Sequence, residues 1–101
     1  LRFGSLEIDR DARAVLVAGK ACELTSYQFD LLVALAERAG RVLTRDQLLA
    51  LSNRELDEVF DRSIDGHISR LRQKLGDDPR RPTLLKTIRG AGYMLVSGSA
   101  G

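Results

Sequence analysis

The first 24 residues alternate between short apolar segments and turns that are charged or contain glycine. The apolar segments are LRFGSLEID, AVLVAG and ACEL, and the turns lie at residues 9–13 and 19–20. Short extended segments joined by tight turns pair most readily as antiparallel strands. The pattern therefore predicts a small antiparallel sheet over residues 1–24.

Two helical stretches follow, and both begin with the same signal. Residues 25–28 (TSYQ) and 44–47 (TRDQ) fit a capping box, in which Thr and Gln side chains each accept a bond from a backbone N–H of the first turn. Apolar residues at helical spacing follow the first box and are Phe29, Leu32, Val33 and Ala36. We predict a helix that ends near Gly40, which suits a left-handed C-terminal cap, and a shorter helix through residues 48–51.

A third helix is predicted over residues 62–75, after a polar and acidic loop at residues 52–61. Asp61 fits its N-cap and Gly76 its stop. Its apolar residues fall on one stripe and are Ile64, Ile68, Leu71 and Leu75. The residues that point the opposite way are Arg62, Gly66, Ser69, Arg70 and Gln73. The helix should bury one face and expose a basic and polar one.

Two strand-like segments, LLKTI and YMLV, complete the pattern. Residues 89–92 (RGAG) join them, and the glycines tolerate the positive φ that a tight hairpin needs. Residues 97–101 (SGSAG) look like a loose tail. We predict an α+β domain over residues 1–96, with a small N-terminal antiparallel sheet, three helices and a C-terminal β-hairpin.

Composition narrows the possibilities. A chain of 101 residues that is 44% hydrophobic has the size of one compact domain. It has no apolar run of membrane-spanning length and no signal peptide, so we expect a soluble, cytoplasmic chain without a membrane partner. Cys22 is the only cysteine and His67 the only histidine, which excludes an internal disulfide and a tetrahedral metal site made of protein ligands. We expect no metal and no cofactor.

Positive charge is concentrated in the third predicted helix and the hairpin. Residues 62–93 carry eight Lys or Arg against three acids, a net charge of +5, whereas the whole chain carries +2. Residues 44–61 carry a net charge of −3. This asymmetry suits a surface that docks on a polyanion, and nucleic acid is the first candidate.

A helix, a loop, a basic helix and a hairpin with Arg at its tip resemble a winged helix-turn-helix. The sequence of these segments is similar to the DNA-binding domain of OmpR/PhoB-type response regulators. That family's first two helices match LTSYQFDLLVALAERAGRVLTRDQLL, its recognition helix matches RSIDGHISRLRQKL, and its wing matches KTIRGAGYML. The resemblance covers nearly the whole chain. It implies the effector domain of a two-component transcriptional regulator, a C-terminal half whose phosphorylatable receiver domain is absent from this sequence.

The exposed face and the resemblance together assign roles to individual residues. Candidate base contacts in the major groove are Arg62, Ser63, Gly66, Ser69, Arg70 and Gln73. Candidate phosphate contacts are Thr44, Arg45, His67, Arg72, Lys74 and Lys86. Arg89 at the hairpin tip is expected to enter the minor groove. The resemblance places a contact with RNA polymerase on Asn53, Arg54, Glu55, Asp57 and Glu58.

Each of these assignments has a plainer alternative. The basic helix face could be a solvated surface, Arg89 an ordinary turn charge, His67 a flank histidine and residues 53–61 a solvated linker. The chain also departs from the family at residues 52–53, where a Gly is common, and at Gly66, where the family usually has a larger residue, often Val. Gly66 lacks a side chain that could contact a thymine methyl group.

Other functions fit less well. His67 and Cys22 have no evident catalytic partners, so we do not expect an enzyme. A winged helix that binds protein is the main alternative, although the concentration of Arg on the exposed face argues against it. RNA is disfavoured because the deep, narrow major groove of A-form RNA shuts out a recognition helix. A single module buries limited surface, so we expect pairs of domains on duplex promoter DNA. The resemblance implies that the two domains bind head to tail on direct repeats.

Overall fold

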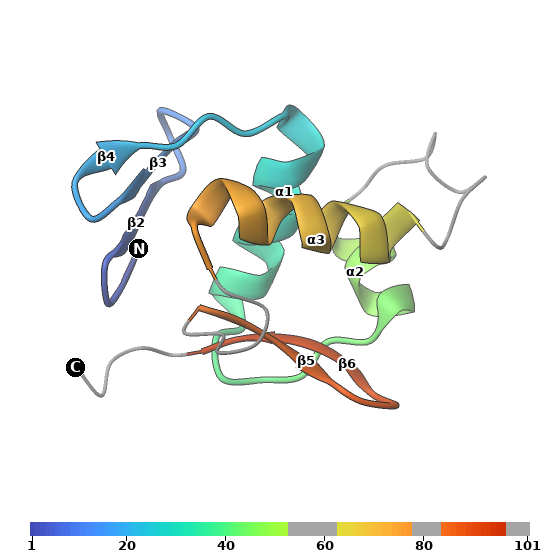
Figure 1. Cartoon of the computed structure of the whole chain (residues 1–101). Coiled ribbons are helices and arrows are strands. Elements are labelled where there is room, and N and C mark those ends of the chain that lie inside the picture. The colour runs from blue at the N-terminus through green and yellow to red at the C-terminus, as the bar shows by residue number, and fades with distance from the viewer. Residues whose placement is uncertain (53–62, 78–83, 97–101) are drawn as a thin grey trace.

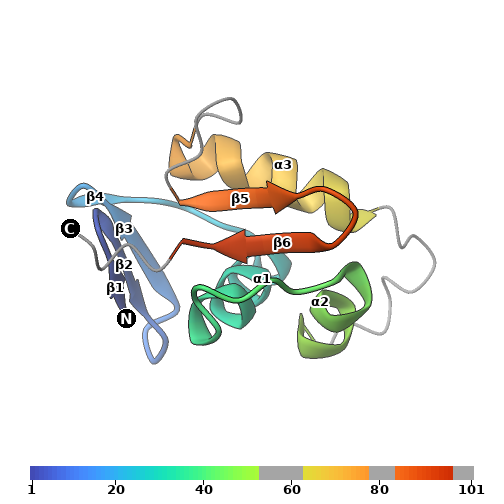
Figure 2. The same cartoon turned by 90° about the horizontal axis from the view of Figure 1, so that it is seen from below.

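The computed structural model describes residues 1–52, 63–77 and 84–96, and these residues form a four-stranded sheet, three helices and a hairpin (Figure 1). The order of elements confirms the predicted α+β architecture. The N-terminal sheet lies at one end of the molecule and the turn of the hairpin at the other (Figure 2). Between them the hairpin runs alongside the third helix (Figures 1 and 2).

The N-terminal sheet is antiparallel, as predicted, and its strands follow chain order. Its strands are β1 (Arg2–Phe3), β2 (Leu6–Asp9), β3 (Ala14–Val17) and β4 (Lys20–Ala21). The first apolar segment holds two strands and not one, because the chain turns at Gly4, where φ is +61°. Leu6, Ile8 and Val15 alternate with exposed or half-buried residues, and all three are buried in the core.

Charged side chains fasten this sheet to the first helix, α1 (Ser26–Glu37). The Nη2 atom of Arg13 lies 3.1 Å from Asp30 Oδ1, and its guanidinium carbon lies 4.5 Å from the centre of the Phe29 ring. Nearby, Arg10 Nη1 lies 2.7 Å from Glu37 Oε2. These contacts hold the turn between β2 and β3 against α1.

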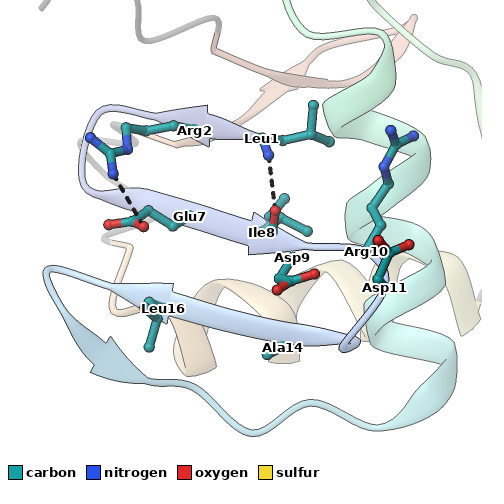
Figure 3. A pocket seen from close by; sticks show the side chains of 9 residues that line it. All are labelled: Leu1, Arg2, Glu7, Ile8, Asp9, Arg10, Asp11, Ala14 and Leu16. Atoms are coloured by element: carbon teal, nitrogen blue, oxygen red, sulfur yellow. Dashed lines mark hydrogen bonds and ion pairs between the residues drawn. The ribbon is translucent and has the colours of Figure 1, made fainter.

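An open hollow of about 620 Å³ lies on this sheet (Figure 3). Arg2 and Glu7 pair at one end of it at 3.3 Å, while Asp9, Arg10 and Asp11 line the other end. Charges of both signs face the hollow. It lacks the single sign of charge that a surface for nucleic acid requires.

Both predicted capping boxes are present. At α1, Thr25 Oγ1 accepts from Gln28 N at 3.1 Å, and Thr25 N donates to Gln28 Oε1 at 3.0 Å. At α2 (Arg45–Ser52), Gln47 N donates to Thr44 Oγ1 at 3.0 Å and Thr44 N donates to Gln47 Oε1 at 2.8 Å. Each box satisfies two backbone N–H groups that a helix leaves without partners at its start.

The third helix, α3 (Ser63–Leu75), ends as the sequence predicts. Gly76 has φ of +73°, and its N–H donates to Gln73 O at 3.2 Å. Asp77 N donates to Arg72 O at 2.9 Å, which completes a Schellman motif. The predicted N-cap, Asp61, and the predicted first residue, Arg62, lie outside the described residues.

The apolar stripe of α3 forms the centre of the core. Its members are fully or almost fully buried and are Ile64, Ile68, Leu71 and Leu75. They belong to one cluster with buried residues of α1, α2 and the hairpin, which include Leu31, Leu32, Leu35, Leu48, Leu85 and Leu95. The predicted buried face of the helix is therefore confirmed.

The hairpin consists of β5 (Leu85–Ile88) and β6 (Gly92–Leu95). The segment between α1 and α2 adds a bridge to its free edge, since Leu43 and Tyr93 exchange backbone bonds of 2.8 and 2.9 Å. This approach requires glycine at residue 92. The φ of Gly92 is +152°, and a Cβ at this position would overlap the carbonyl group of Leu43.

We expect Gly92→Ala to destabilise the domain by more than the roughly 1 to 3 kcal/mol of a strained backbone position, because the new methyl group also meets backbone atoms. Gly90→Ala is the matched control, since Gly90 also has positive φ (+76°) but open space around its Cβ position. Urea unfolding of both variants gives the comparison. Equal losses of unfolding free energy would contradict the close approach.

Candidate nucleic-acid interface

The outward face of α3 is exposed in the second half of the helix, among the residues that the structure describes. Ser69, Arg70 and Gln73 are exposed, and Lys74 is exposed at the edge of the same face. Gly66 is partly exposed and lies among them by helical spacing. Ser63 is the first residue of α3, while Arg62 lies outside the described residues. The helix therefore presents a basic and polar surface opposite its buried stripe.

The hairpin adds exposed cations beside α3. Lys86 lies on β5, and Arg89 lies in the turn, next to Gly90, whose φ is +76°. A small hollow of about 140 Å³ lies where the turn approaches the start of α2, lined by Arg45 and the residues from Thr87 to Tyr93. Thr44 is exposed beside it, and its hydroxyl accepts the capping bond.

Arg72, a predicted phosphate contact, is bonded within the protein. Its Nε donates to Leu85 O at 3.1 Å and its Nη2 donates to Thr87 Oγ1 at 2.6 Å. Its guanidinium carbon lies 5.9 Å from the centre of the Tyr93 ring. The side chain therefore ties α3 to β5, and these bonds would compete with a phosphate for its donors. The sequence did not indicate this role, because the partners are 13 and 15 residues away.

His67, another predicted phosphate contact, lies on the flank of α3 that faces α1. Its ring centre lies 4.5 Å from that of Tyr27, with the ring planes at 79°. This edge-to-face arrangement is typical of packed aromatic rings. The structure favours the plainer alternative of a flank histidine, and a phosphate contact by His67 stays a prediction.

Asp65 makes contacts within the candidate interface that the sequence did not predict. Its Oδ1 accepts a bond from Arg45 Nε at 3.0 Å and a second bond from the hydroxyl of Tyr93. One carboxylate oxygen thus joins the start of α2, the first turn of α3 and the hairpin. A signal existed, since Asp65 is an acid in the first turn of an otherwise basic helix, but its partners lie 20 and 28 residues away.

The protonation states of this cluster follow from its contacts. The bond from Arg45, followed by the bond from Tyr93, lowers the pKa of Asp65 below its ordinary value. Burial, together with the neighbouring Asp65 carboxylate, raises the pKa of Tyr93 to about 12. At neutral pH the carboxylate is therefore ionised and the phenol keeps its proton to donate.

The described part of the structure does not meet the needs of a metal site or of a membrane-spanning helix. Residues 1–52, 63–77 and 84–96 contain no group of His, Cys, Asp and Glu that could hold a metal ion, and none of their helices is long and apolar enough to cross a membrane. The thiol of Cys22 donates to Lys74 O at 3.1 Å, and burial raises the pKa of that thiol. A raised pKa disfavours the reactive thiolate.

Comparison with known proteins identifies the family. Residues 19–95 match the family model described as "Transcriptional regulatory protein, C terminal". The chain belongs to this family. Within it, the fold and the relatives are those of OmpR/PhoB-type response regulators, so the chain is a winged-helix C-terminal domain of that type. It is a family of transcriptional regulators and not of enzymes.

Individual relatives cover most of this chain. The regulatory protein VirG of Rhizobium rhizogenes is 50% identical over 84 residues, which are 83% of this chain and 35% of VirG. The DNA-binding domain of Klebsiella pneumoniae RstA, solved in complex with the RstA box, is 40% identical, with a TM-score of 0.86 and 96% of each chain covered. The response regulator DrrB, a Thermotoga maritima OmpR/PhoB homologue, is 42% identical with a TM-score of 0.85, over 95% of this chain and 43% of DrrB.

Gly66 lies on the exposed face of α3 in this winged-helix domain, and the structure shows room for a side chain at this position. Among the described residues, a Cβ at Gly66 meets no heavy atom within 4 Å beyond its own stretch of helix. We expect Gly66→Ala to raise the free energy of unfolding by roughly 0.5 to 1 kcal/mol, because Ala loses less backbone entropy in a helix. Gly66→Val should gain less, since a β-branched side chain is restricted in a helix.

Urea unfolding of the three proteins measures this order. Ser69→Ala is a suitable control on the same exposed face, and it should change stability by less than about 0.5 kcal/mol. A loss of stability in Gly66→Ala would mean that residue 66 is packed or strained and that the exposed face has been placed wrongly.

Proposed function

We propose that this winged-helix domain binds double-stranded DNA sequence-specifically, as the effector domain of a two-component transcriptional regulator. The observation that carries the proposal is the uncovered basic face of α3, fixed beside a hairpin with Arg89 in its exposed turn. The major groove of B-DNA admits an α-helix, and narrow A·T-rich minor grooves attract Arg. The fold is also that of the RstA domain solved with the RstA box.

The candidate residues divide into those that would contact base edges and those that would contact the DNA backbone. We assign major-groove base contacts to Arg62, Ser63, Gly66, Ser69, Arg70 and Gln73. We assign phosphate contacts to Thr44, Arg45, Lys74 and Lys86, and a minor-groove contact to Arg89. Arg guanidinium groups can bond guanine O6 and N7 through two N–H groups, which makes Arg70 the strongest candidate for reading a base. His67 and Arg72 rank below the others because of their contacts within the protein.

The proposals for a receiver domain, for paired domains and for RNA polymerase rest on comparison with longer relatives. The chain spans 35% of VirG and 43% of DrrB, so we propose that it works within a longer protein that has a receiver domain. Pairing head to tail on direct repeats would supply the surface that one module lacks. Contact with RNA polymerase through residues 53–58 is a proposal whose residues lie outside the described ones. Promoter binding implies work in the cytoplasm.

A module that binds protein is the second candidate, and the charge pattern disfavours it. The centres of protein interfaces are rich in aromatic residues, Met and Arg, and they are depleted in Lys and Ser. On the described part of the exposed α3 face the side chains are polar or basic, while Tyr93 is buried. Phosphates suit such a surface better than an apolar partner does.

Salt dependence tests the proposal directly. With about four to six phosphate contacts and a slope near −0.9 for each, log affinity should fall by roughly 4 to 5 units per tenfold increase in salt. Titration of the purified chain into a labelled duplex, selected by the same chain from a random pool, measures this slope. A random duplex serves as the control for specificity. An affinity that hardly changes between low and physiological salt would sink the proposal.

Arg70 and Arg89 should affect binding in different ways. Arg70→Ala should cost about 1 to 3 kcal/mol on the selected site and relax the preference at one base pair, because it removes a reader of base edges. Arg89→Ala should weaken binding mainly where the flank is A·T-rich. Sites selected by each variant from one random pool give the two profiles. The same uniform loss for both variants would show that neither residue reads sequence as assigned.

A further inference from the structure

Asp65 stands in an unfavourable place for a protein that binds DNA. It is an acid in the first turn of a helix whose exposed face is basic, and its side chain is 44% exposed. A carboxylate near phosphates repels them. The plain explanation is that an acid near a helix N-terminus interacts favourably with the helix dipole. That explanation accounts for a negative charge and not for the two contacts that Asp65 makes.

Those contacts join elements that are distant in the sequence. Asp65 Oδ1 holds Arg45 Nε at 3.0 Å, and the Arg45 side chain stays 57% exposed while it is held. The same oxygen accepts from the hydroxyl of Tyr93. Tyr93 in turn is bridged to Leu43 through its backbone, one residue before the capping box of α2. The start of α2, the first turn of α3 and strand β6 thus meet at one carboxylate.

We propose that Asp65 is a positioning residue for DNA binding: it orients the exposed guanidinium of Arg45 toward a phosphate and keeps the wing in register with α3. This proposal rests on the proposed DNA binding. It adds Asp65, which is not among the residues assigned above to base or phosphate contacts. The positive charge of Arg45 also offsets the negative charge of the carboxylate, which reduces its repulsion toward DNA. The acceptor position, and not the negative charge, is what binding requires.

Three substitutions separate position from charge. Asp65→Asn removes the charge and keeps an oxygen at the same distance from the backbone. Asp65→Glu keeps the charge and displaces the oxygens by one methylene group. Asp65→Ala removes both. Each is compared with the wild-type chain by titration into the selected duplex over a range of salt, with urea unfolding measured in parallel to account for any loss of stability.

If Asp65 acts as a positioning residue, the variants should differ in their affinity for DNA in a definite order. Asp65→Ala should bind the selected duplex about tenfold more weakly, with a salt slope shallower by about 0.9 because one phosphate contact is lost. Asp65→Asn should keep the wild-type slope, and Asp65→Glu should resemble Asp65→Ala. In addition, Arg45→Ala should weaken binding in the wild-type background and have little effect when combined with Asp65→Ala, because the two act as one unit.

Other results would overturn the proposal. If charge alone matters, Asp65→Asn and Asp65→Ala will behave alike and Asp65→Glu like the wild type. Independent losses from Arg45→Ala and Asp65→Ala would also refute it. Should Asp65→Ala fail to fold, the order of Asp65→Asn and Asp65→Glu decides. A wild-type chain that does not bind duplex DNA would refute the proposed function itself, whereas a binding wild type with the wrong order refutes only the role of Asp65.

Discussion

Burial of one face of α3 is the constraint on which the rest of the structure depends. Ile64, Ile68 and Leu71 are completely buried against α1, α2 and the hairpin. Each such side chain contributes about 1.5 to 3 kcal/mol when it is taken out of water. No rotation of the helix keeps this gain and also hides Arg70 and Gln73. The hydrophobic core therefore decides that the basic face points outward.

Polar contacts fix the relative positions of α3, α2 and the hairpin more than they contribute to the free energy of unfolding. The ion pair of Arg45 and Asp65 is about half exposed, and exposed pairs of this kind typically contribute less than about 1 kcal/mol. Apolar side chains, however, tolerate small shifts along and around a helix, whereas a hydrogen bond fixes a distance and an angle. Arg72 fixes α3 against β5, and Asp65 fixes it against α2 and β6. The wing and the recognition helix are therefore held as one unit before any DNA arrives.

The sequence predicts what is local and misses what depends on distant partners. The two capping boxes and the stop at Gly76 need only neighbouring residues, and all three are found where the pattern places them. The apolar stripe of α3 follows from helical spacing alone. By contrast, the turn at Gly4 that divides the first apolar segment was not recognised, because a Gly-Ser pair there is also compatible with one longer strand.

The candidate site divides in the same way. Exposure of Ser69, Arg70 and Gln73 follows from periodicity, so these positions could be assigned in advance. The internal bonds of Arg72 could not, since nothing in a run of basic residues tells which cation turns back toward the protein. The contacts of Asp65 need three segments to be brought together by folding, and no spacing in the sequence encodes that meeting.

Separation of the two faces of α3 also limits how specificity can change. A substitution on the buried stripe alters packing and costs stability, whereas Gly66, Ser69 and Gln73 can change without disturbing the core. If α3 reads DNA as proposed, changes in the preferred DNA sequence should therefore concentrate on this outward face. Asp65, Arg72 and Tyr93 set where that face stands relative to the wing, so they should constrain the spacing of contacts and not their identity. In the proposed DNA complex, base preference would be carried by the outward face of α3, and geometry by Asp65 and Arg72 of α3 together with Tyr93 of β6.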